Sequence, residues 1–191
     1  MYKKGGRKNM NQQLIDEIRT MPNNVDSIAK ITQKIIRDLK SKEFPIPIVK
    51  IMKELNFLVG TQELEDNLSG YIVISEDIVK KFGNDKLICV NSKDSFGHQR
   101  FTIAHELAHF LFDYAPVQSD EYYNTYRTDD VDDEKEQRAN KFAANLLMPE
   151  EEFRAKYEEL RYDDDKLAKL IKYFEVSKKA VLLRIRELEI V

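Results

Sequence analysis

The chain has 191 residues, 42% of them hydrophobic and 34% charged, which suits one domain with an appendage or two small domains. Its formal net charge of −3 excludes a general electrostatic attraction to nucleic acid or to acidic membranes. The single cysteine, Cys89, excludes an intramolecular disulfide, and the chain has neither a membrane-length apolar run nor a signal peptide, so we expect a cytoplasmic protein that does not contact a membrane.

The N-terminal third is expected to contain a tail followed by helices. Residues 1–22 are assigned to a flexible tail because the first eleven are basic and almost free of apolar side chains, although a short helix can form at residues 12–20. Asp26 or Ser27 can cap the next helix, whose isoleucines recur at helical spacing. Pro47 can begin a further helix. We assign residues 23–150 to one domain, which includes these helices.

After residue 56 the residue composition changes to short runs that favour β-strands. Residues 57–59, 70–74 and 86–90 are rich in β-branched and aromatic side chains and are separated by Gly, Asn, Asp and Ser. They predict a small, mainly antiparallel sheet, and with the flanking helices they indicate an α+β fold. Residues 114–130 are polar, contain four tyrosines and have no clear period, so we expect them to be disordered or to form a functional loop.

Residues 101–110, Phe-Thr-Ile-Ala-His-Glu-Leu-Ala-His-Phe, hold two of the three histidines of the chain in a His-Glu-x-x-His pattern. Helical positions i and i+4 share a face, so His105 and His109 can bind one divalent ion while Glu106 stands beside them as a general base. The alternative is a surface helix that carries two histidines by chance. Apolar residues cover more than half of the helix circumference, which favours a buried helix whose polar strip faces an internal cleft.

A catalytic zinc usually takes three protein ligands, and the third has two candidate sources. His98 lies seven residues before His105, about 10 Å along a continuous helix, which is too far to share the ion. We therefore expect His98 to be either a surface polar residue or a group that contacts substrate or stabilises an oxyanion.

Residues 132–147 are the better source of a ligand. Glu136 lies on the apolar face of this predicted helix, where a carboxylate is costly to bury without a partner. A metal would meet that need, a salt bridge is the alternative, and Asp132 on the same face is a competing carboxylate. Asn140, one turn after Glu136, could hydrogen-bond a ligand histidine, whereas Arg138 is expected to point away.

Residues 151–191 are predicted to be a helical C-terminal extension. Helices at residues 163–174 and 178–188, joined by a short turn, have the cadence of a helix-turn-helix. Between residues 163 and 189, seven Lys and Arg residues are balanced by six acids, which disfavours DNA binding and favours packing or partner docking.

Two motifs together resemble a known family. RFTIAHELAH at residues 100–109, followed by a Glu-x-x-Ala-Asn-x-Phe-Ala-Ala-x-Leu-Leu-Met-Pro segment at residues 136–149, is similar to the ImmA/IrrE metallopeptidases. The resemblance implies a zincin-like fold, metal bound by His105, His109 and Glu136, and Glu106 as the catalytic base. It also implies that the substrate is a helix-turn-helix repressor.

The chain departs from the family pattern at two positions. Ala108 stands where the family often has Gly, and Asp113 stands where it often has a further His, which leaves open what tunes the site. We predict an endopeptidase that uses Zn²⁺, with Mn²⁺ as the other candidate metal. The alternative function is a non-proteolytic anti-repressor or DNA-associated regulator in which the metal is only structural.

Overall fold

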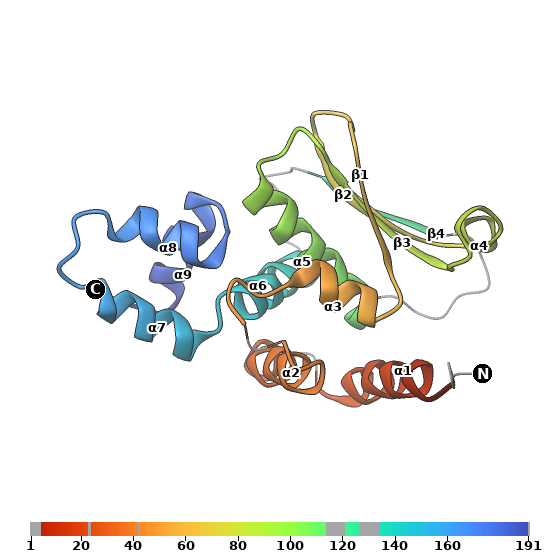
Figure 1. The fold of residues 1–191 in the computed structure, drawn as a ribbon, viewed down its shortest axis with the longest axis horizontal. Helices are drawn as coiled ribbons and strands as arrows, with labels where there is room; N and C mark the ends of the chain where they lie inside the picture. Colours follow the sequence, from red (N-terminus) through yellow and green to blue (C-terminus); the bar gives the residue numbers. More distant parts are fainter. Residues whose placement is uncertain (1–4, 23, 42, 114–120, 127–133, 191) are drawn as a thin grey trace.

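The computed structural model describes residues 5–22, 24–41, 43–113, 121–126 and 134–190. Its central element is α5 (Phe96–Phe112), which lies between the sheet on one side and the helices α1 (Gly5–Thr20) and α2 (Val25–Asp38) on the other (Figure 1). Helix α6 (Glu134–Leu147) packs directly against α5, and α2 packs against α6. The predicted α+β fold class is confirmed.

In the described part of the chain the sheet has four strands, β1 (Leu58–Gln62), β2 (Leu68–Ile74), β3 (Lys86–Asn91) and β4 (Glu121–Tyr126), which lie in the order β1-β3-β2-β4. β1 pairs in parallel with β3, while the β2–β3 and β2–β4 pairs are antiparallel, as expected for a mainly antiparallel sheet. Three of the strands lie at or next to the predicted runs.

β4 corrects the expectation for the tyrosine-containing stretch. Residues 121–126 are neither disordered nor a loop, because their backbone pairs with β2 from Ile74 opposite Glu121 to Leu68 opposite Tyr126. Tyr and Thr favour strands, but the segment has no apolar alternation that would have indicated one. Residues 114–120 and 127–133 lie outside the described part of the chain.

The N-terminal helices are α1 (Gly5–Thr20), α2 (Val25–Asp38) and α3 (Ile48–Glu54). Leu14, Ile15 and Ile18 share one face of α1 and are buried in the core. Arg19 donates a hydrogen bond of 2.9 Å to the Phe110 carbonyl of α5. The expectation of a flexible tail therefore does not hold for residues 12–20, because this apolar face ties the helix to α5.

Helix α4 (Glu76–Phe82) was not predicted, although its boundaries carry ordinary signals. The Ser75 side chain accepts a hydrogen bond from the Ile78 amide, and Gly83 ends the helix at φ 71°. A serine cap with acids in the first turn and a glycine stop would have indicated this helix.

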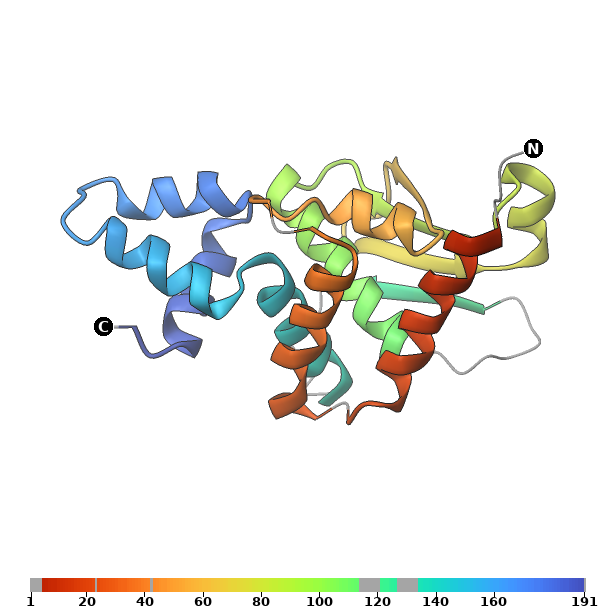
Figure 2. The same ribbon diagram turned by 60° about the horizontal axis from the view of Figure 1, so that its bottom comes forward.

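The C-terminal helices are α7 (Glu150–Glu159), α8 (Lys166–Phe174) and α9 (Lys178–Glu187). They stand beside α6 and the N-terminal end of α5 in both views (Figures 1 and 2). Phe153, Phe174 and Val181 belong to the same buried cluster as Ile103 and Leu107 of α5. The cluster is continuous across residue 150, and the domain boundary there stays a prediction. No described helix is both long enough and apolar enough to cross a membrane.

Candidate metal centre

Helix α5 carries the His-Glu-x-x-His segment in a largely buried setting. Ser95 caps the helix by accepting a hydrogen bond from the His98 amide, and the sheet and α6 cover its middle. His105 is 4% exposed and Glu106 is fully buried. The prediction of a buried helix with internal polar groups is confirmed.

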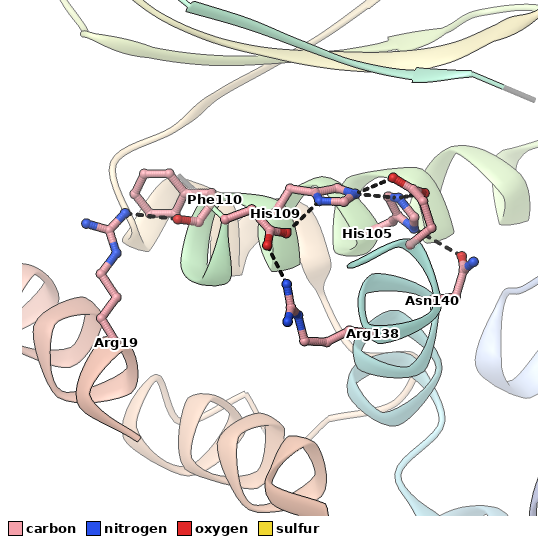
Figure 3. Close-up of polar contacts among 8 residues, drawn as sticks. Arg19, His105, His109, Phe110, Arg138 and Asn140 are labelled. Carbon is pink, nitrogen blue, oxygen red and sulfur yellow. Dashed lines mark hydrogen bonds and ion pairs between the residues drawn. The ribbon is translucent and has the colours of Figure 1, made fainter. Parts of the chain in front are cut away.

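Three side chains converge on one point between α5 and α6 (Figure 3). The Nε2 atoms of His105 and His109 are 2.9 Å apart. The two carboxylate oxygens of Glu136 lie 3.1 Å from these nitrogens, one oxygen from each. The ligand atoms of all three residues lie within 4.8 Å of one another. Asp132, the competing carboxylate, lies outside the described residues.

The other ring nitrogens face hydrogen-bond acceptors. His105 Nδ1 lies 3.0 Å from Asn140 Oδ1, as the spacing in α6 predicted. His109 Nδ1 lies 2.9 Å from Asp113 Oδ2. An acceptor at Nδ1 keeps the proton there and leaves the Nε2 lone pair free, which is the tautomer a metal needs.

These residues fit a divalent cation. Two imidazole lone pairs and a carboxylate would repel one another at these distances unless positive charge lay between them. Both oxygens of Glu106 are buried and have no hydrogen-bond partner among the described residues. Imidazole and carboxylate ligands suit zinc and also manganese, so the donor set allows both predicted metals.

The pKa shifts reflect the same attraction for positive charge. Burial lowers the pKa of His109, but hydrogen bonds to Asp113 and Glu136 outweigh it and raise the value to about 9. Hydrogen bonds from His105 and His109 hold the pKa of Glu136 well below its usual range. Burial raises the pKa of Glu106 to about 8. A proton on His109 here meets the need that a cation would otherwise meet.

Two further residues differ in their relation to the site. Arg138 does not point away as expected, because its long side chain reaches the Asp113 carboxylate and forms an ion pair with it. His98 is not brought to the cluster: its Nε2 lies 3.2 Å from Ser69 Oγ, and its side chain is 41% exposed. A role for His98 in substrate contact stays a prediction.

A buried helix with His-Glu-x-x-His and a carboxylate from the following helix is the arrangement of a zincin-like metallopeptidase. The family model Peptidase_M78, the IrrE N-terminal-like domain, matches residues 57–186, and the chain therefore belongs to the ImmA/IrrE family. The match includes both sequence motifs and reaches into α9. None of the curated proteins matches the chain.

Proposed function

We propose that this protein is a metal-dependent endopeptidase whose general base is Glu106. One observation carries the proposal: His105, His109 and Glu136 converge beside a buried glutamate whose oxygens have no partner among the described residues. A structural metal alone would not need that glutamate. Family membership supports peptide-bond hydrolysis as the reaction.

His105, His109 and Glu136 would hold Zn²⁺ or Mn²⁺. A bound divalent cation supplies Lewis-acid polarisation of the scissile carbonyl and lowers the pKa of water to about 7. Glu106 accepts the proton of the attacking water and delivers it to the leaving amine. Its burial favours this role, because desolvation raises the pKa of a carboxyl group and makes the carboxylate a stronger base.

We propose a helix-turn-helix repressor as the substrate, on the strength of the family resemblance. A repressor substrate would place the enzyme in the cytoplasm. The seven cations and six acids of residues 163–189 support docking of a protein partner over DNA binding.

The experiment combines purified protein, Zn²⁺ or Mn²⁺, and a candidate helix-turn-helix repressor. Glu106→Gln should cleave about 10² to 10⁴ times more slowly, because it removes general acid–base catalysis but none of the three ligands. Glu151→Gln, an exposed change on α7, is the control and should cleave at the wild-type rate. Cleavage by Glu106→Gln at the wild-type rate would show that the mechanism is wrong.

The same assay distinguishes the alternative function. If chelation of the metal lowered the melting temperature but left inactivation of the repressor intact, the protein would be a non-proteolytic anti-repressor. The metal would then serve stability alone.

A further inference from the structure

The two histidines of the site are held by chemically different groups. A neutral amide, Asn140, faces His105 Nδ1, whereas the carboxylate of Asp113 faces His109 Nδ1 at 2.9 Å. Asp113 follows His109 by one helical turn, and its side chain is only 10% exposed. Its position is also where the chain departs from the family pattern, so the structure is the only guide to its role.

Helix stability does not explain a carboxylate at this position. Asp113 is the C-terminal cap of α5, where the helix dipole disfavours negative charge. The backbone amide of Asp113 makes the capping hydrogen bond to the His109 carbonyl, so the carboxylate is not needed for capping. Burying it adds a desolvation cost. Its contacts with His109 and Arg138 offset these costs.

Arg138 secures this carboxylate from α6. Its guanidinium forms an ion pair with Asp113 Oδ1, leaving Asp113 Oδ2 for His109, and lies 5.6 Å from the centre of the Phe112 ring. Arg138 Nε is buried without a hydrogen-bond partner among the described residues, so Asp113 is the main polar contact of this side chain. Figure 3 shows Arg138 and Asn140 reaching α5 from the same helix.

We propose that Asp113 and Arg138 are a positioning pair that orients His109 and strengthens metal binding. The inference rests on the proposed metal centre. Asp113 accepts the Nδ1 proton, which fixes the ring with Nε2 toward Glu136, and its negative charge makes the imidazole a stronger ligand. Arg138 keeps the Asp113 carboxylate in place. Through these two contacts, α6 positions His109 as well as His105.

The test measures Zn²⁺ affinity by competition with a chromophoric chelator. Asp113→Ala should weaken Zn²⁺ binding about 10- to 100-fold, the usual effect of removing a group that orients a ligand. Asp113→Asn should weaken it less, because an amide oxygen still accepts the Nδ1 proton. Arg138→Ala should also weaken binding, and the double variant Asp113→Ala with Arg138→Ala should be no weaker than Asp113→Ala alone.

Asp38→Asn is the matched control. Asp38 is an aspartate of α2 that forms ion pairs with Lys34 and Arg37 of the same helix, each at 2.9 Å, so the variant should keep wild-type Zn²⁺ affinity. If Asp113→Ala lowered the melting temperature of the metal-free protein but bound Zn²⁺ as wild type does, the pair would be structural and the inference overturned. Multiplying effects in the double variant would also overturn it. A wild-type protein that bound no Zn²⁺ would overturn the metal centre itself.

Discussion

Two buried arginines, Arg100 and Arg184, hold the C-terminal helices to the rest of the fold, and we call them the C-terminal clamps. The metal centre and these clamps both bury charged side chains, but they differ in how many hydrogen bonds those side chains make. Arg184 is 1% exposed and donates to the Met148 carbonyl, Asn145 and Glu187. Glu106 is equally buried, and neither of its oxygens has a partner among the described residues.

Arg100 repeats the pattern of Arg184 at the other clamp. It donates to the Ile46 carbonyl at 2.7 Å and to the Glu175 carbonyl at 3.0 Å, which joins α5 to the turn between α8 and α9. Buried groups whose hydrogen bonds are made hold a fold together, whereas a buried group without partners costs stability. Arg100 and Arg184 therefore stabilise the fold, whereas the burial of Glu106 is better explained by a role in the reaction.

The largest expected effect on stability is at a clamp. Arg184→Ala should lower the free energy of unfolding by about 3–5 kcal/mol, because it removes the hydrogen bonds to the Met148 carbonyl and to Asn145 Oδ1 in the interior. Chemical denaturation measures this change. Arg186→Ala, an exposed change on the same helix, should cost less than about 0.5 kcal/mol. Zn²⁺ affinity should stay at the wild-type value. A parallel loss of Zn²⁺ affinity would show that the clamp belongs to the site.

At the metal centre the expected change in the free energy of unfolding has the opposite sign, because replacing Glu106 should stabilise the metal-free protein. The pKa of Glu106 is raised to about 8 in the folded protein from 4.5, so metal-free wild type should lose stability as the pH rises from about 4.5 to about 8. Glu106→Gln has no proton to lose, and at pH 7 it should be more stable than wild type by about 3 kcal/mol.

The measurement is denaturation in the presence of a chelator at pH 5 and pH 7. The difference between Glu106→Gln and wild type should be small at pH 5 and large at pH 7. His109 and Glu136 contribute a pH dependence to both proteins, so only the difference is informative. An equal difference at both pH values would mean that folding does not shift the pKa of Glu106.

The core of the site could be predicted because it follows helical spacing. His105 and His109 are one turn apart on α5, and Glu136 and Asn140 are one turn apart on α6. An i, i+4 pattern fixes which side chains share a face, whatever the tertiary structure. That α6 turns its Glu136 face toward α5 was inferred from the cost of a carboxylate among apolar side chains.

The remaining contacts depend on packing, which no local period encodes. Arg138 was assigned away from the site, because helical spacing does not account for the reach of a long side chain. Asp113 had a signal in its i, i+4 spacing from His109, and only the fold shows that Arg138 meets it. β4 is held by pairing with β2, and its own sequence has no apolar alternation.

The smallest expected effect on stability concerns Gly97, which lies against the turn between α8 and α9 that Arg100 contacts. Gly97 lies in the first turn of α5, where an alanine would ordinarily stabilise the helix by up to about 1 kcal/mol. A Cβ atom there would lie 2.6 Å from the Val176 carbonyl carbon and 2.9 Å from the Ser177 nitrogen. These are backbone atoms of a turn beside the buried Val176, so they cannot move as freely as the end of a flexible side chain.

Overpacking should outweigh helix propensity, and Gly97→Ala should lower the free energy of unfolding by about 1–2 kcal/mol. Gly60→Ala in β1 is the control, because its Cβ would meet only the Leu87 side chain at 4.0 Å. Denaturation of the two variants beside wild type gives the comparison. If Gly97→Ala were instead stabilising, the turn between α8 and α9 would not pack closely against α5 in solution. The contacts around Arg100 would then be less tightly packed than those around Arg184.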